Sequence, residues 1–219
     1  MSTAAHHALQ RQLKELMVHP VPGFRVAMKD DNIFEWEVGI IGPLGTPYEG
    51  GYFLATLKFP QDYPFNPPSF TFHNNFYHPN VYADGKLCIS ILHAPGEDEM
   101  SGETAAERWN PTQSVESILL SIISLLNDPN PSSPANIDAS VMFRTDKEAF
   151  DARVRGLVEK SKNDIPHDLV MPTTEADFMY KRPVEVDEDD WFDDEDYDEE
   201  LDDSNEEEDD EEEEEEEDS

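Results

Sequence analysis

Three segments near the start of the chain alternate apolar and polar side chains with a period of two. The alternating apolar positions fall in residues 24–28, 34–40 and 53–59. This pattern is typical of β-strands that bury one face. The links, residues 30–32 and 42–51, are too short to hold a crossover helix, so the strands are predicted to pair as an antiparallel meander. Phe70 and Phe72 extend this meander with a fourth strand.

Helical spacing precedes and follows the meander. Residues 4–18 place leucines at intervals of three and four and stop before Pro20, and residues 113–127 are apolar over most of their surface. The second of these helices is therefore expected to be largely buried. Residues 138–160 predict one or two further helices, which makes the fold class α+β. Residues 74–112 keep no clear period, and so long an irregular segment in a compact domain indicates a function.

Charge divides the chain into unlike parts. Of its 51 acidic residues, 26 lie in residues 187–219, which contain no Lys or Arg. Such a block buries too little apolar surface to offset the entropy of ordering, so it is expected to be disordered. We therefore expect a folded domain at residues 1–160, a linker at 161–186 and an acidic tail at 187–219. The acidity repels nucleic acid and anionic membranes and favours a basic protein surface as the partner.

The remaining composition indicates a reducing compartment. One cysteine allows no intrachain disulfide and no cysteine-rich zinc site. The first residues lack the basic and apolar regions of a signal peptide. The longest nearly apolar run, residues 117–126, is about half the length of a membrane span. We expect a protein of the cytoplasm and the nucleus.

The single cysteine, Cys88, ends the segment HPNVYADGKLC, residues 78–88. A free cysteine is most often a small buried hydrophobe, but a turn-rich loop is also where reactive groups are displayed. A metal site built with His78 and His93 lacks a fourth ligand. If the thiol is a nucleophile, His78 or His93 is the local candidate for a general base, as in a cysteine hydrolase, although the flanks resemble no known protease.

The same segment resembles the active-site signature of ubiquitin-conjugating enzymes, in which His-Pro-Asn precedes the acceptor cysteine at this spacing. The resemblance covers roughly residues 8–150 and includes the stretches FEWEVGIIGPLGTPYEGGYF, KFPQDYPFNPPSFTF and WNPTQSVESILLSIISLLNDPNP. It implies the ubiquitin-conjugating fold, with an N-terminal helix, a four-stranded antiparallel sheet, an irregular active-site flap and C-terminal helices. This expectation agrees with the fold that the periodicity predicts, and it makes residues 1–160 a catalytic domain.

An insertion at residues 93–108 and the acidic tail narrow the resemblance from the whole family to one subclass of it. The acidic residues of the insertion are Glu97, Asp98, Glu99, Glu103 and Glu107. With the tail, the insertion is similar to that of the subclass that serves cullin-RING ligases of the SCF type. Members of this subclass carry Ser at the positions of Ser90 and Ser133, whereas Asn66 departs from the subclass and is no marker.

The resemblance implies two successive acyl transfers. Cys88 accepts the C-terminus of ubiquitin as a thioester from an activating enzyme, and a lysine of a substrate or of ubiquitin then attacks that thioester. A thioester is already activated, so no catalytic dyad is required at the cysteine. No cofactor is expected to be bound, since the activating enzyme uses the ATP. Asn80 is predicted to donate its side-chain amide to the oxyanion, or else to pin the backbone of the flap.

Other residues near the cysteine receive roles from the same resemblance. His78 and Pro79 are expected to be structural parts of the flap. Tyr82 and Ser133 are candidates for lining the approach of the lysine, although Tyr82 could equally be a packing residue. The acidic insertion is expected to attract and orient that lysine.

Partner surfaces follow in the same way. Phe65 and Pro111 match the two loops that receive a RING domain, and Arg11 and Lys14 on the first helix match the contact with the activating enzyme. The tail is either a solvated extension or an electrostatic tether to a basic groove on the cullin. The expected outcome is degradation of the substrates.

Two rival functions remain. One is a binding module on the same fold without catalysis, which the presence of Cys88 disfavours. The other is an acidic chaperone for basic proteins, in which the tail would be central and the thiol incidental.

Overall fold

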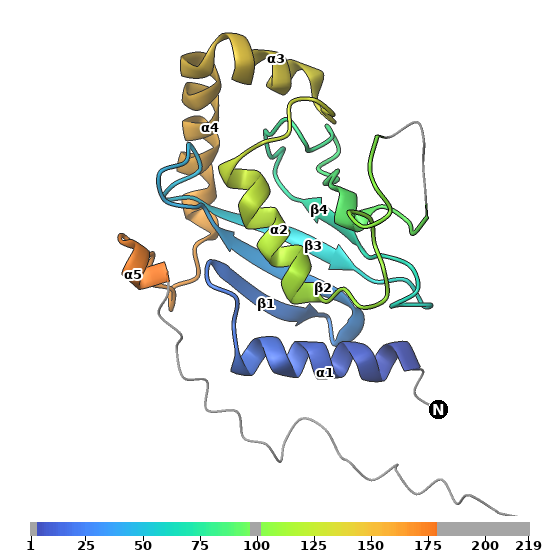
Figure 1. Ribbon diagram of the computed structural model, residues 1–219. Coiled ribbons are helices and arrows are strands. Elements are labelled where there is room, and N and C mark those ends of the chain that lie inside the picture. Colours follow the sequence, from blue (N-terminus) through green and yellow to red (C-terminus); the bar gives the residue numbers. More distant parts are fainter. Residues whose placement is uncertain (1–3, 97–101, 179–219) are drawn as a thin grey trace, which may run out of the picture. The chain divides into compact units, whose positions relative to one another are not determined.

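The computed structural model describes residues 4–96 and 102–178, all of which belong to one compact unit (Figure 1). Its helices and strands are, in chain order, α1 Ala4–Val18, β1 Phe24–Lys29, β2 Asn32–Ile41, β3 Tyr52–Lys58, β4 Ser69–Phe72, η1 Ser90–Leu92, α2 Val115–Asn127, α3 Ile137–Thr145, α4 Lys147–Ser161, η2 Lys162–Asp164 and α5 Glu175–Phe178. The α+β class is confirmed, with an N-terminal helix, one sheet and C-terminal helices.

The four strands form an antiparallel sheet in the order β1-β2-β3-β4, as the short links predict. Trp36 of β2 lies opposite Leu57 of β3, and Leu57 lies opposite Phe70 of β4. All three are fully buried, which contributes about 1.5–3 kcal/mol for each side chain. The apolar positions of the alternating pattern therefore lie opposite one another on neighbouring strands and form the buried face of the sheet.

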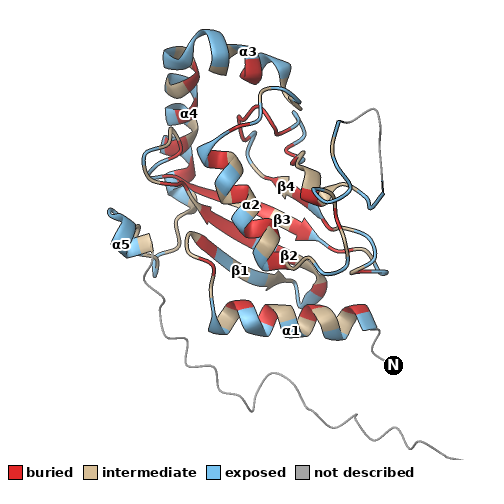
Figure 2. Cartoon of the chain, viewed as in Figure 1, coloured by how far each residue is buried: buried red, intermediate tan, exposed pale blue. Residues whose placement is uncertain are grey.

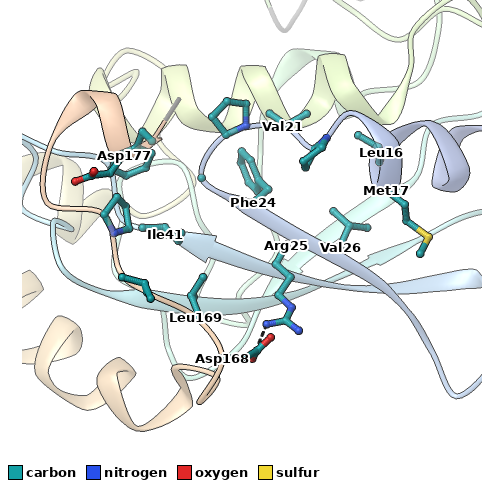
Figure 3. A pocket seen from close by; sticks show the side chains of 16 residues that line it. Leu16, Met17, Val21, Phe24, Arg25, Val26, Ile41, Asp168, Leu169 and Asp177 are labelled. Carbon is teal, nitrogen blue, oxygen red and sulfur yellow. Dashed lines mark hydrogen bonds and ion pairs between the residues drawn. The ribbon is translucent and has the colours of Figure 1, made fainter. Parts of the chain in front are cut away.

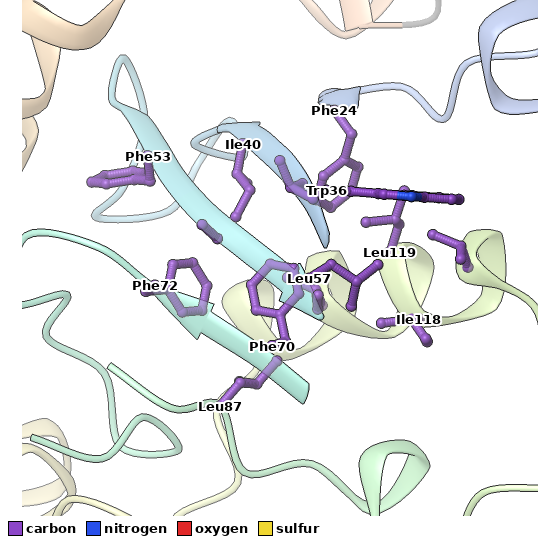
Figure 4. Close-up of a cluster of buried hydrophobic side chains, with 14 of the residues drawn as sticks. Phe24, Trp36, Ile40, Phe53, Leu57, Phe70, Phe72, Leu87, Ile118 and Leu119 are labelled. Carbon is purple, nitrogen blue, oxygen red and sulfur yellow. The ribbon is translucent and has the colours of Figure 1, made fainter. Parts of the chain in front are cut away.

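Helix α2 covers this face of the sheet, and the core lies between them (Figure 4). Its buried residues follow helical spacing: Val115, Ile118, Leu119, Ile122 and Leu126. Figure 2 shows the same division, with buried positions on the sheet and on the inner side of α2. The helix begins at Val115 rather than at residue 113, because Ser114 is its N-cap and forms a capping box with Ser117.

Helices α3 and α4 follow α2 and are each started by a capping side chain. Asn136 caps α3 and Asp146 caps α4, each by accepting a hydrogen bond from the backbone N–H three residues later. At the other end of α4, the Oγ of Ser161 accepts a hydrogen bond of 3.1 Å from the backbone N–H of Tyr52 at the start of β3. The C-terminal end of α4 is thereby attached to the sheet.

Residues 73–89, called the flap below, are attached to the outer edge of β4. The backbone N–H of Leu87 donates to the carbonyl of Phe70, and that of Phe72 to the carbonyl of Gly85, both at 2.9 Å. Gly85 has a φ of 88°, and a Cβ there would lie 2.2 Å from the Phe72 carbonyl oxygen, so this turn needs glycine. Before β4, the peptide bond between Tyr63 and Pro64 is cis.

The first part of residues 161–186 packs against the domain. Arg25 of β1 forms an ion pair of 2.9 Å with Asp168. Between this segment, β1 and the end of α1 lies a largely apolar hollow of about 610 Å³, lined in part by Leu16, Phe24 and Leu169 (Figure 3). None of the helices in the described part of the chain combines the length and the hydropathy that a membrane crossing needs.

Candidate active site

Cys88 lies at the end of the flap, where a backbone hydrogen bond holds it in place. Its N–H donates to the carbonyl of Asn80 at 2.9 Å, next to the bridge between Val81 and Leu87. The side chain is partly buried. The hydroxyl of Tyr82 lies 3.7 Å from the Sγ on one side, and the Nε2 of His93 lies 3.6 Å from it. The thiol is therefore accessible and lies between two polar side chains.

Tyr82 is one of these neighbours and is 44% exposed. The pKa of the Tyr82 hydroxyl is raised, most strongly by its hydrogen bond with Cys88 and next by the negative charge of the Cys88 thiolate. The hydroxyl thus stays protonated at neutral pH and donates toward the sulfur. This contact places Tyr82 beside the cysteine, while its role in lining the approach of the lysine stays a prediction.

His93, the first residue of the insertion, connects the thiol to an acidic residue of the same insertion. Its Nδ1 lies 2.9 and 2.8 Å from the two carboxylate oxygens of Glu103. The Oγ of Ser90 donates to the same carboxylate at 2.9 Å, and Arg108 lies 3.8 Å from it. Because Nδ1 faces a carboxylate, it carries the proton in the neutral ring, which leaves the lone pair of Nε2 toward the Cys88 sulfur.

The remaining acidic residues of the insertion lie elsewhere. Glu107 is exposed and accepts hydrogen bonds from the backbone and side chain of Thr104, which lower its pKa. Glu97, Asp98 and Glu99 lie outside the described residues. Within the described part of the insertion, Glu103 is thus the acidic residue that reaches the thiol through His93.

His78 is fully buried and has both ring nitrogens engaged within the fold. Its Nδ1 accepts a hydrogen bond of 2.9 Å from the backbone N–H of Asn80, and its Nε2 donates to the carbonyl of Leu125 at 3.2 Å. Burial lowers the pKa of His78 to about 4, despite this bond to Leu125. The neighbouring Pro79 is also buried and accepts a hydrogen bond from the backbone of Asn136. Both residues thus lie inside the flap and bond to its surroundings, and their purely structural role stays a prediction.

Asn80 is 2% exposed, and its side chain joins the flap to the connection between α2 and α3. Its Nδ2 donates to the carbonyls of Asn130, at 2.8 Å, and of Ser133, at 3.2 Å. Its Oδ1 accepts from the backbone N–H of Asn130 at 2.9 Å. The amide thus bonds to two backbone carbonyls of that connection, which are the contacts that the pinning role needs. The oxyanion role stays a prediction.

Ser133 is placed on the surface by this connection. Its side chain is exposed, and its carbonyl is the group that Asn80 contacts. The structure thus brings Ser133 to the flap through the backbone, while a role for its hydroxyl toward lysine stays a prediction.

The residues predicted to meet partner proteins are exposed. Phe65 is 68% exposed, and Pro111 lies on the surface of the second loop. The indole N–H of the buried Trp109 donates to the carbonyl of Pro64 at 2.7 Å and ties the two loops together. Arg11 and Lys14 point to solvent from one side of α1, at i and i+3.

Sequence reasoning named His93 and Glu103 separately but did not pair them. They are separated by an irregular segment without periodicity, so spacing gives no signal that they meet. Within residues 4–96 and 102–178, no group of three or more His, Cys, Asp or Glu side chains is arranged to hold a metal ion.

Comparisons with known proteins agree with the fold and with the cysteine on its flap. A family model described as Ubiquitin-conjugating enzyme matches residues 8–158. Ubiquitin-conjugating enzyme E2 15 of Schizosaccharomyces pombe is 54% identical over 161 residues, covering 73% of this chain and 96% of that protein. Ubiquitin-conjugating enzyme E2 G2 of Homo sapiens is 49% identical over 162 residues, covering 74% and 98%.

A further relative aligns over a longer part of the chain. Ubiquitin-conjugating enzyme E2-34 kDa of Saccharomyces cerevisiae is 46% identical over 190 residues, which are 85% of this chain and 64% of that protein.

An α+β domain that presents one thiol on a flap beside a four-stranded meander is the architecture of a cysteine acyl carrier. The chain belongs to the ubiquitin-conjugating enzyme family. It is an enzyme, and membership of this family implies ubiquitin, a ubiquitin-activating enzyme and a ubiquitin ligase as its partners.

Proposed function

We propose that Cys88 carries ubiquitin as a thioester and passes it to lysines of substrates or of ubiquitin with a cullin-RING ligase, for degradation of the substrate. The observation that supports the carrier role is the accessible thiol at the end of a flap that both backbone and side chains hold in place. A preformed position of this kind removes the need to order the nucleophile during the reaction.

The two steps balance without an external co-reactant. In charging, the Cys88 thiolate attacks the carbonyl carbon of the activating-enzyme thioester; the new C–S bond forms as the old one breaks and releases the enzyme's thiol. In discharge, a lysine amine attacks the Cys88 thioester, forms the C–N bond and releases the Cys88 sulfur, which regains a proton. Because the thioester is already activated, the chain needs no bound cofactor.

The residues around the thiol support the discharge step in our proposal. Asn80 holds the flap against the connection that contains Ser133, and in the reaction its amide can exchange a carbonyl partner for the oxyanion. Tyr82 borders the side from which the lysine approaches. The acidic residues of the insertion provide a negative field that attracts the ammonium group.

The cullin-RING partnership rests on the sequence of the insertion and tail. The insertion at residues 93–108 and the tail at residues 187–219 are both acidic, and Ser90 stands two residues after the cysteine. In this proposal, Phe65 and Pro111 receive the RING domain, Arg11 and Lys14 contact the activating enzyme, and the tail binds a basic groove of the cullin. Such a partnership is suited to an enzyme present in both cytoplasm and nucleus.

The test is ubiquitin loading. Wild-type protein and Cys88→Ala are incubated with activating enzyme, ATP and ubiquitin, and the products are compared on reducing and non-reducing gels. We expect an adduct of one ubiquitin that thiol reagents remove and that Cys88→Ala lacks. A Cys88→Ala protein that still forms this adduct would contradict the carrier role of Cys88.

A further inference from the structure

The insertion brings a histidine and a carboxylate to the thiol in one line. Sγ of Cys88 and Nε2 of His93 are 3.6 Å apart, and Nδ1 of His93 is 2.8 Å from the nearer oxygen of Glu103. This order of thiol, imidazole and carboxylate is the general arrangement of an activated nucleophile, a base and the group that orients the base. The family reaction does not require such a base, so its presence here calls for an explanation.

We propose that His93 takes the proton of the Cys88 thiol when ubiquitin is charged, and that Glu103 positions His93 for this transfer. The inference rests on the proposed role of Cys88 as the ubiquitin acceptor. The thiol proton moves to Nε2, the thiolate attacks the activating-enzyme thioester, and the imidazolium returns the proton to the departing thiolate. Bonds and protons balance, and no further reagent is needed.

The contacts of Glu103 give it the geometry of a positioning residue. Its carboxylate accepts from Ser90 as well as from His93, and Arg108 lies 3.8 Å away. The backbone of His93 is fixed too, because its carbonyl accepts from the N–H of the buried Trp109 at 3.1 Å. His93 is therefore held at two points, its backbone carbonyl and the Nδ1 of its ring.

Polar and charged groups surround the ring at the place where the proposed transfer forms an imidazolium. Among the described residues, the titratable groups that face this line are Cys88, Glu103, Arg108 and Tyr82, whose hydroxyl lies 3.7 Å from the sulfur. An imidazolium lies between a thiolate and a carboxylate, while the neutral Tyr82 hydroxyl donates to the sulfur. Nucleophilic cysteines in other proteins use a neighbouring protonated histidine in the same way.

The test is the pH profile of Cys88 alkylation by iodoacetamide, which reports the thiolate without ubiquitin or activating enzyme. With one cysteine in the chain, the incorporated label reports this site alone. For His93→Gln we expect the midpoint of the profile to rise by about one pH unit and alkylation at pH 7 to slow about tenfold. For Glu103→Gln we expect a smaller slowing, about threefold, with a shift in the same direction.

The control is His167→Gln, which removes an exposed histidine from the C-terminal segment and should leave the profile unchanged. A His93→Gln profile that superimposes on wild type, or that falls equally at every pH, overturns the proposal, because a proton shared between the thiol and His93 requires the midpoint to move when the ring is removed. Single-turnover charging, followed over the same pH range, should show the same shift. Cys88→Ala that still charges would refute the acceptor role and leave the alkylation result standing.

Discussion

Two histidines near the thiol differ in what surrounds their rings. His78 is fully buried with both nitrogens bonded, whereas the side chain of His93 is 33% exposed and faces a carboxylate and a sulfur. Desolvation disfavours the charged form of the first. The ring of the second lies between the Cys88 sulfur, at 3.6 Å, and the Glu103 carboxylate, at 2.8 Å. At the scale of the residue, the same side chain therefore serves as a structural acceptor in one place and is suited to proton transfer in the other.

The buried His78 makes stability depend on pH. Its pKa is about 4 in the folded protein against 6.5 unperturbed, so between these values the unfolded chain binds more protons. Stability therefore falls as the pH falls through this window, by about 2–3 kcal/mol at pH 4.5. Urea unfolding of wild type and His78→Gln at pH 7 and pH 4.5 measures this contribution.

The loss of unfolding free energy between the two pH values should be larger in wild type than in His78→Gln. Carboxylates titrate in both proteins, so the difference between the two slopes isolates the imidazole. His167→Gln, from the surface, should keep the wild-type slope. Equal slopes in wild type and His78→Gln would show that the pKa of the ring is the same in the folded and unfolded protein and would contradict this prediction.

At the scale of elements, the flap depends on a segment far away in the chain. The side chain of Asn80 makes three hydrogen bonds to the connection between α2 and α3, and the backbone of Asn136 donates to Pro79. The other side of the flap is joined to β4. The cysteine is thus positioned by a segment fixed on both sides.

Removing the Asn80 side chain should weaken this attachment. In Asn80→Ala, the N–H of Asn130 and two carbonyls lose their hydrogen bonds to the buried Asn80 side chain, so we expect the free energy of unfolding to fall by about 1–3 kcal/mol. If the amide also donates to the oxyanion, discharge of the thioester to lysine should slow by about 100-fold. Denaturant unfolding and single-turnover discharge measure the two effects.

Asn127→Ala is the matched control, since its exposed amide bonds within α2 to the carbonyl of Ile123. It should change neither quantity by a comparable amount. Unchanged stability in Asn80→Ala would argue against pinning, and unchanged discharge would argue against the oxyanion role.

At the scale of the whole molecule, the densest negative charge and the hydrophobic core lie in different parts of the chain. The described domain contains the hydrophobic core, whereas about half of all acidic residues lie in the tail at residues 187–219. The composition of the tail indicates a source of negative field with few apolar residues to bury. We therefore expect that the tail can be changed without disturbing the thiol.

We expect neutralisation of the tail to affect ligase-dependent steps alone. A chain whose Asp and Glu at residues 187–219 are replaced by Asn and Gln should transfer ubiquitin more slowly with a cullin-RING ligase at low salt. Its rate should also depend less on salt, because steering by charge is screened. Charging by the activating enzyme serves as the internal control and should be unaffected. Equal ligase rates and equal salt dependence would remove the tether from the proposal.

More of the fold than of the site could be predicted from the sequence. Alternation and short links identified the meander, because burial on one face imposes a period of two whatever the partner strands are. The start of α2 was placed two residues early, since Ser114 could be read either as helix or as cap. The position of the cis bond, at Tyr63-Pro64, gave no signal in the sequence.

At the site, the cysteine and its flap could be identified from one continuous segment. The pairing of His93 with Glu103, and the partners of Asn80, could not, because these contacts join residues across irregular chain whose path is set by tertiary packing. Local patterns carry no information on such contacts, so the connection between the acidic insertion and the thiol emerged from the structure.

The attachment of the flap to β4 has a consequence for solubility. An unpaired edge strand offers its N–H and C=O groups to other chains and can start aggregation. Here the bonds from Phe72 to Gly85 and from Leu87 to Phe70 occupy that edge. The segment that presents the reactive thiol is thus also the segment that shields the sheet from self-association. Damage that frees the flap would therefore both misplace the thiol, which inactivates the enzyme, and expose the edge of β4, which promotes aggregation.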